Sequence, residues 1–333
     1  MKRFVKIYTY WLLGMLLFTG CDDYLKEDSG DLLIPGKVDE FLPMLYKEGF
    51  PQNFNEEVAW LYLMTDDVEM GQLELDPDDE SYETRDKNSL DALSAGEGEE
   101  PYKWEREIKS YADNFWERRY GNILACNLVI DALPEMKYVE ADSGVYNFLA
   151  AQAYALRAYY YWCLVNSYAL PWSKENLDKP GVIIRTEPQI DISARGRSSI
   201  RDVYDLINGD IEEAEKYIKV ATFDGNIHRL SEPAILLLAS RIALFQENWD
   251  EVIRTGELFL AQNSVILNLN DQDTTLFGTE KGLNNKIFTM MDGTINKEVV
   301  FTFGTSSYTP YDYLSTSGTF YGLGFRPSHS TDE

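Results

Sequence analysis

The segment Ala151-Gln152-Ala153-Tyr154-Ala155-Leu156-Arg157-Ala158-Tyr159-Tyr160-Tyr161-Trp162 decides the fold of this chain. Apolar side chains recur in and around it at steps of three and four residues, which predicts a helix from about Tyr146 to Tyr168. The alanines allow a neighbouring helix to pack closely, because the distance between packed helices depends on the side chains at their contact. Leu170 and Pro171 end the helix, since proline cannot continue it.

Helical periodicity also appears on both sides of this segment. The upstream pattern starts after Trp104 and stops at Pro134. Downstream, Ser198 and Ser199 predict a helix cap, and Pro233 lies where the first turn of a helix accepts proline. The other predicted helices are Val38 to Tyr46, Phe115 to Leu133, Val203 to Ile218, Pro233 to Leu244 and Val252 to Leu260.

Short turns connect several of these helices, as at Asn248-Trp249-Asp250. Two helices joined by a short turn, with small residues at their crossing, are typical of tetratricopeptide repeats. We therefore predict a mainly α fold of divergent tetratricopeptide-type helix pairs with irregular, loop-rich segments. Beyond Gln262 the helical pattern stops, and the run from Glu298 to Phe303 predicts one strand.

Composition and charge exclude several classes of function. The 333 residues carry a net charge of −26, which argues against a nucleic-acid partner because phosphate binding requires a basic surface. The histidines are only His228 and His329, so a histidine-based metal site or a catalytic triad is poorly supported. Cys126 and Cys163 lie on apolar helical stretches and are expected to be free thiols, with a disulfide between them as the alternative.

The segment from residue 66 to residue 100 is strongly acidic and irregular, with the runs Asp76 to Glu80 and Gly96 to Glu100. We interpret it as a solvated surface loop. A calcium-binding loop is the alternative, because Ca²⁺ prefers clustered carboxylates. The alternating D-x-D-x-D-G order of such loops is absent from this stretch.

The N-terminus resembles the leader of a bacterial lipoprotein. A basic start precedes an apolar run, Ile7 to Thr19, that is too short for a membrane span of about 20 residues. Gly20 followed by Cys21 resembles a lipobox, which implies cleavage before Cys21 and acylation of that residue, for instance with palmitate. An ordinary signal peptide with a chance cysteine is the alternative. The expected divisions are a signal peptide over 1–20, a tether over 21–35 and the main domain over 36–333.

Several blocks of the chain resemble, in order, the helices of the SusD/RagB family of outer-membrane nutrient-binding lipoproteins from Bacteroidetes. Residues 151–162 are similar to the family's A-E-A-x-F-L-R-A-Y-Y-Y-F helix, with Gln152 in place of Glu. The resemblance implies that Arg157 and Arg241 pair within the helical core. Family members are longer, so we expect the domain 36–333 to be incomplete at its C-terminus. The other matching blocks are Phe115-Trp116 to Tyr120 with Ile123 and Asn127, Asp202-Val203-Tyr204, Arg229-Leu230-Ser231, Leu237 to Arg241 and Asn248-Trp249.

The resemblance implies a binding protein and not an enzyme. Such a protein is a lipid-anchored, outward-facing lid of the outer membrane that works with a SusC-like TonB-dependent β-barrel transporter. It captures oligosaccharides or oligopeptides and requires no cofactor. A glycosidase needs a carboxylate pair, but the 56 acidic residues always offer one, so their presence is no argument for it. A helical-repeat scaffold that binds only proteins, without a small-ligand site, is the alternative.

The ligand-binding residues are not marked by the family's motifs. We therefore chose aromatic side chains on or next to predicted loops, because aromatic groups line small-ligand sites together with a few polar groups. These candidates are Tyr82, Trp104, Trp172, Tyr308, Tyr311 and Tyr321.

Overall fold

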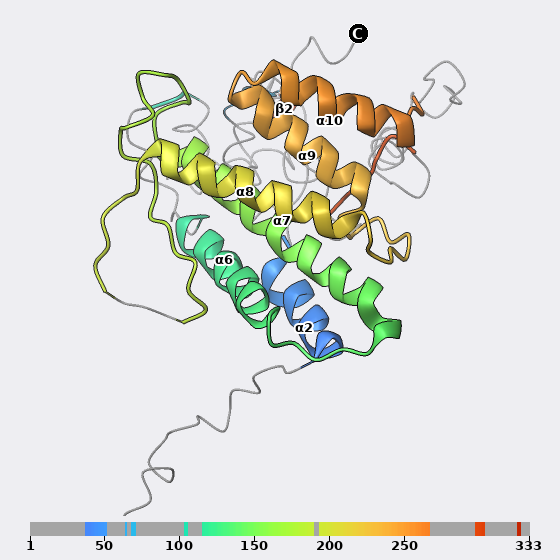
Figure 1. Ribbon diagram of the computed structural model, residues 1–333. Coiled ribbons are helices and arrows are strands. Elements are labelled where there is room, and N and C mark those ends of the chain that lie inside the picture. The colour runs from blue at the N-terminus through green and yellow to red at the C-terminus, as the bar shows by residue number, and fades with distance from the viewer. Residues whose placement is uncertain are drawn as a thin grey trace, which may run out of the picture. The chain divides into compact units, whose positions relative to one another are not determined.

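Helix α7 (Ser143–Tyr168) contains the segment that the sequence singled out, and it lies at the centre of the helices α2, α6, α8 and α9 (Figure 1). The computed structural model describes residues 37–51, 64, 68–70, 103–105, 115–189, 193–266, 297–303 and 325–327. Its other elements are α2 (Val38–Met44), the π-helix η2 (Leu45–Gly49), α6 (Phe115–Ala132), the 3-10 turn η3 (Glu140–Asp142), α8 (Ile200–Ile218), α9 (Glu232–Phe245), α10 (Trp249–Gln262) and the strands β1 (Val68–Met70) and β2 (Phe325–Pro327).

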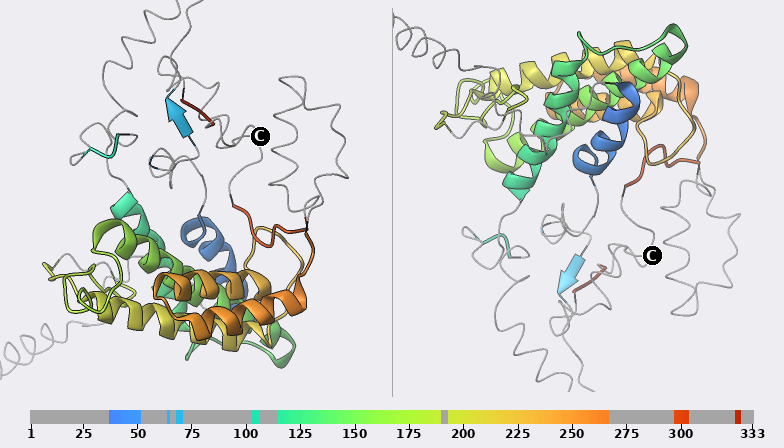
Figure 2. Two further views of the ribbon diagram at one scale, coloured as in Figure 1. Left: turned by 90° about the horizontal axis from the view of Figure 1, so that it is seen from above. Right: turned by 90° about the horizontal axis from the view of Figure 1, so that it is seen from below.

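Helix α7 contacts α2, α6 and α8, and α9 and α10 form a hairpin beside α8 (Figure 2). The close approach that the alanines predicted is confirmed, because Ala151, Ala155 and Ala158 have no exposed surface. The mainly α fold of helix pairs is also confirmed. The strands β1 and β2 pair in antiparallel register, with Glu69 opposite Arg326.

The ends of the helices follow the predicted capping signals. The Ser199 side chain accepts a hydrogen bond from the backbone N–H of Asp202, and the Asp202 carboxylate accepts one from the backbone N–H of Ser199. Ser231 caps α9 with a proline in the first turn, and Asn248 caps α10. Each cap satisfies a backbone donor that the first turn of a helix leaves without a partner.

A buried ion pair joins the three central helices. The Arg157 guanidinium on α7 donates to both carboxylate oxygens of Asp210 on α8, at 2.8 and 2.7 Å, and to the Asn127 side-chain oxygen on α6 at 2.9 Å. All three side chains are at least nine-tenths buried. The bidentate geometry satisfies both charges in a place with little access to water. The pairing predicted for Arg157 is therefore confirmed.

Gln152 performs a task that a glutamate could not perform in its ionised form. Its side-chain amide donates to the carbonyl oxygen of Leu230, and its side-chain oxygen accepts from the backbone N–H of Leu230, both at 2.8 Å. A carboxylate accepts hydrogen bonds only, so it would leave the buried carbonyl of Leu230 without this donor. This pair of bonds fastens α7 to the segment that leads into α9.

The sequence was wrong about two features. Arg241 is exposed on α9 and does not join the core. The run from Glu298 to Phe303 is not a strand. Among the described residues, its backbone bond to another segment is the one that the Thr302 N–H donates to the Ile227 carbonyl at 3.1 Å. A strand requires a ladder of such bonds with a neighbouring strand, and the 226–228 turn offers none.

The remaining features are the two cysteines, the possibility of a membrane-spanning helix and the segments that the structure does not describe. Cys126 and Cys163 are not joined by a disulfide, as expected. In the part of the chain described, none of the helices has the length and apolar character to cross a bilayer. Cys21, the 1–20 and 21–35 segments and almost all of the acidic 66–100 segment lie outside the described residues, so those expectations remain predictions.

The central ion pair leads to a stability prediction. Replacing Asp210 with Ala leaves the Arg157 charge buried without its carboxylate, and we expect the free energy of unfolding to fall by about 3–5 kcal/mol. Urea unfolding followed by circular dichroism measures this change. Asp205, exposed on the same helix, is the matched control, and Asp205→Ala should change the stability by less than about 0.5 kcal/mol. Equal losses of stability in Asp210→Ala and Asp205→Ala would contradict the stabilising role of the buried ion pair.

The cap of α8 leads to a pH prediction. The hydroxyl and the backbone N–H of Ser199 donate to Asp202 and hold the pKa of its carboxyl below the usual 3.8. A lowered pKa means that the stabilisation is complete above the unfolded-state pKa and is lost as the pH falls through the folded-state pKa. The advantage of the wild type over Asp202→Asn in urea midpoint should thus be constant at pH values well above 3.8 and should shrink as the pH falls below 3.8. A difference in urea midpoint between the wild type and Asp202→Asn that does not vary with pH would contradict this role of the Asp202 carboxylate.

Candidate functional site

Two of the six aromatic candidates chosen from the sequence, Trp104 and Trp172, lie within the described residues. Trp104 lies in a turn, has 67% of its surface exposed and adopts a positive φ of 54°. Trp172 is half-buried, and its ring packs edge-on against Tyr204 with centroids 4.7 Å apart. The other candidates, Tyr82, Tyr308, Tyr311 and Tyr321, lie outside the described residues. Neither Trp104 nor Trp172 lines the two hollows described below.

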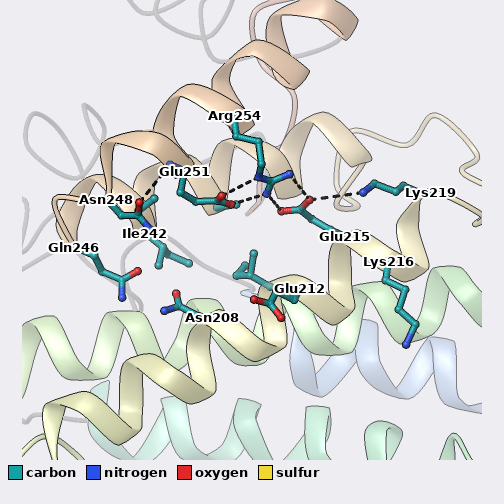
Figure 3. Close-up of a pocket in the computed structure, with 13 residues that line it drawn as sticks. Asn208, Glu212, Glu215, Lys216, Lys219, Ile242, Gln246, Asn248, Glu251 and Arg254 are labelled. Carbon is teal, nitrogen blue, oxygen red and sulfur yellow. Dashed lines mark hydrogen bonds and ion pairs between the residues drawn. The ribbon is translucent and has the colours of Figure 1, made fainter.

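The first hollow, which we call the polar cavity, lies between α8, α9 and α10 and has a volume of about 430 Å³ (Figure 3). Its apolar wall comes from Ile211 and Ile242, among others. Its charged groups pair mainly with each other or with near neighbours, and Figure 3 shows that Arg254 lies between the carboxylates of Glu215 and Glu251. The side chains that line it are Asn208, Ile211, Glu212, Glu215, Lys216, Lys219, Ala239, Ile242, Ala243, Gln246, Asn248, Glu251 and Arg254.

The ion pairs of the polar cavity hold α10 against α8. The Arg254 guanidinium donates to the Glu215 carboxylate at 2.6 and 3.1 Å and to the Glu251 carboxylate at 2.8 Å. The two carboxylates raise the pKa of Arg254 above its usual value. Lys219 lies 3.9 Å from Glu215, and Lys216 pairs with Glu213, which does not line the cavity. These ion pairs join α10 to α8. A charged ligand that entered the polar cavity would have to displace them, so the cavity is better suited to holding the helices together than to binding a ligand.

The second hollow, which we call the α6 groove, runs between α6 and the segment of residues 183–189. Its volume is about 350 Å³. An indole and a phenol, from Trp116 and Tyr120, form its aromatic part, and their ring centroids are 5.0 Å apart. The lining side chains are Trp116, Glu117, Tyr120, Ile123, Leu124, Asn127, Ile183, Arg185, Glu187 and Gln189.

The wall of the α6 groove is fastened to the helical core. Tyr120 donates its hydroxyl to the carbonyl of Ile183 at 2.6 Å. The Asn127 amide, which also belongs to the central ion-pair network through its oxygen, donates to the carbonyls of Arg185 and Glu187 at 3.0 and 3.2 Å. The groove is therefore formed before any ligand arrives, which lowers the ordering cost of binding.

The sequence alone did not identify the α6 groove. Trp116 and Tyr120 appeared only as part of a scaffold helix, although their spacing of four residues places both rings on one face. The opposing wall comes from residues 183–189, which no periodicity marks. Among the described residues, no group of histidine, cysteine, aspartate and glutamate side chains is arranged to hold a metal ion.

The helix pairs, α9 with α10 among them, place this protein in the class of mainly α-helical proteins. Residues 44–244, more than half of the chain, match the SusD-like family that is described as "Starch-binding associating with outer membrane". The chain belongs to this SusD-like family.

Individual relatives agree with this assignment. A SusD-like protein of Formosa agariphila is 28% identical over 158 residues, which are 46% of this chain and 27% of that protein. A SusD-like protein structure from Bacteroides fragilis superposes with a TM-score of 0.56 at 16% identity, over 88% of this chain and 51% of the other. A SusD-like carbohydrate binding protein from Bacteroides vulgatus gives a TM-score of 0.50 at 21% identity, over 71% of this chain and 47% of the other.

The chain spans about half the length of these solved structures and a smaller share of the Formosa protein. At these identities the structural likeness establishes the fold. The expected SusD/RagB resemblance is thus confirmed at the level of the family.

The polar cavity leads to a prediction for Arg254. Arg254→Ala removes the two short hydrogen bonds of the mostly buried Glu215 carboxylate and leaves it the weaker contact with Lys219 at 3.9 Å. Because a buried charge then loses its main partner, we expect the free energy of unfolding to fall by about 1–3 kcal/mol. Amide hydrogen exchange should show the loss concentrated in α10. Arg241→Ala, on the exposed face of α9, serves as the control and should leave both measurements unchanged. Unaltered exchange in α10 after loss of Arg254 would contradict the proposed role.

Proposed function

We propose that this protein is a glycan-binding lipoprotein of the outer membrane that passes its ligand to a SusC-like TonB-dependent transporter. Membership of the SusD-like family, whose description combines starch binding with association to the outer membrane, is the observation that carries the proposal. The carbohydrate-binding relative from Bacteroides vulgatus agrees with it. Binding, not bond cleavage, is the activity that we assign.

Membrane attachment in this proposal depends on Cys21. A lipobox cysteine carries acyl chains, and one chain alone gives only marginal anchoring, so stable attachment requires more than one. The mature protein would then be held at the membrane by residues 21–35, with its helical domain outside the bilayer. An outward orientation follows from the family resemblance and from the acidic residues Asp22 and Asp23 directly after the cysteine.

Two other ligand classes are weighed against a glycan. An oligopeptide is the ligand of the RagB branch, and a scaffold function would involve proteins only. The description of the matched family names starch, which favours a glycan for this chain. The hairpin of α9 and α10 is what the scaffold alternative has in its favour, because helix pairs build protein-binding surfaces.

The proposal predicts which molecules accompany the protein in its native membrane. A tagged chain, extracted from the outer membrane in mild detergent, should bring down a TonB-dependent barrel in equal amount, as mass spectrometry of the eluate would show. A retained glycan, identified in the same eluate, would establish the ligand class. Other proteins without a barrel would support the scaffold alternative, and a retained peptide would support the RagB-like one.

Two cysteine variants control this experiment. Cys21→Ser should lose metabolic labelling with an alkyne fatty acid and leave the membrane fraction, whereas Cys163→Ser, which changes a free thiol on α7, should behave as the wild type. Labelling that persists in Cys21→Ser would contradict the lipid anchor, independently of what the pull-down shows.

A further inference from the structure

We propose that the α6 groove is a glycan subsite that holds one or two pyranose rings of a neutral oligosaccharide. The inference rests on the proposed function and deepens it, because nothing in the family's scaffold motifs assigns a ligand to Trp116 or Tyr120. Three properties of the α6 groove support a glycan subsite: the geometry of its aromatic rings, the polar groups at its edge and its volume.

The aromatic part of the groove is preorganised. The planes of Trp116 and Tyr120 meet at 48°, which gives an angled pair of ring faces and not a closed stack. Tyr168 supports the indole edge-on at 4.9 Å, and the Arg197 guanidinium lies 5.9 Å from its centre. The apolar C–H face of a pyranose stacks on such rings, and rings that are already held in place lose little freedom when they bind.

The polar groups at the edge of the groove suit hydroxyl groups. Arg185 contributes donors, Glu117 and Glu187 contribute carboxylate acceptors, and Gln189 contributes both. Glu187 accepts from Arg195 at 2.9 Å, and this partner holds the pKa of the Glu187 carboxyl below its usual 4.5, so it is ionised near neutral pH. A sugar hydroxyl can donate to the carboxylates and accept from the guanidinium or the amide.

The charges around the groove favour a neutral ligand. Carboxylates and a guanidinium stand on the same rim, so neither a cation nor an anion finds a surface of one sign. The net charge of −26 also opposes an anionic ligand such as a phosphate or a uronate.

The main chain of the groove wall favours a sugar over an extended peptide. The carbonyls of Ile183, Arg185 and Glu187 already accept side-chain hydrogen bonds from α6. A peptide that adds to another chain uses a row of main-chain groups, whereas recognition here would depend on side chains.

The size of the groove sets the length of the ligand segment. Its volume of about 350 Å³ is near the lower end of the range of about 300–1,000 Å³ for small-molecule sites. Only a short part of an oligosaccharide therefore enters it, and the rest of the chain would lie outside.

The test uses the full chain and a defined set of probes. Binding of maltoheptaose, cellohexaose and mannohexaose is measured by titration calorimetry, with a tryptic peptide mixture as the comparison. Trp116→Ala removes the stacking surface, and Leu124→Trp fills the groove without removing any aromatic ring. Trp249→Ala is the matched control, because Trp249 is 58% exposed on α10 and does not line the groove.

The inference is supported if one of the glycans binds the wild type and both groove variants weaken it on the order of tenfold or more, while Trp249→Ala stays within about twofold. Thermal unfolding of each variant verifies that it is folded. If Trp116→Ala does not fold, Leu124→Trp still tests the groove. Glycan binding that is unchanged in folded groove variants would overturn the subsite and leave the proposed function in place. Peptide binding without glycan binding, or no binding of any probe, would overturn both.

Discussion

The buried contact of Arg157 with Asp210 and Asn127 is the constraint on which the rest of this structure depends. It places a full charge from α7 between α8 and α6, where water cannot compensate it, so both neighbours must be present and correctly oriented. A core made only of apolar side chains would tolerate several arrangements of the same helices. The bidentate geometry restricts these arrangements, because a guanidinium and a carboxylate align along two parallel hydrogen bonds.

The same network reaches the surface through Asn127. Its oxygen accepts from Arg157 inside the core, while its amide holds the carbonyls of the 185–187 backbone at the wall of the α6 groove. Tyr161 strengthens this connection, because its hydroxyl donates to the Arg185 carbonyl at 2.7 Å and accepts from the Arg185 N–H at 2.8 Å. Side-chain hydrogen bonds from α6 and α7 thus fix this irregular segment, as the proposed ligand-binding wall would require.

The two hollows differ in what their side chains do within the fold. In the polar cavity, Arg254 and Glu215 neutralise each other and join α10 to α8 (Figure 3). In the α6 groove, the aromatic rings and the side chains of the rim are presented to the outside.

The sequence by itself determined the helices and their ends. Periodicity located α7 and α8, and Ser199 and Ser231 marked the starts of helices, because capping and periodicity involve residues that are near in the chain. It also indicated the family, through blocks whose order survives where single residues differ. Only the tertiary structure decided that Arg241 is exposed while Arg157 is buried, that residues 298–303 do not form a strand, and that Trp116 borders a groove. These outcomes depend on which distant segment covers each face, and contacts between distant segments leave no local pattern in the chain.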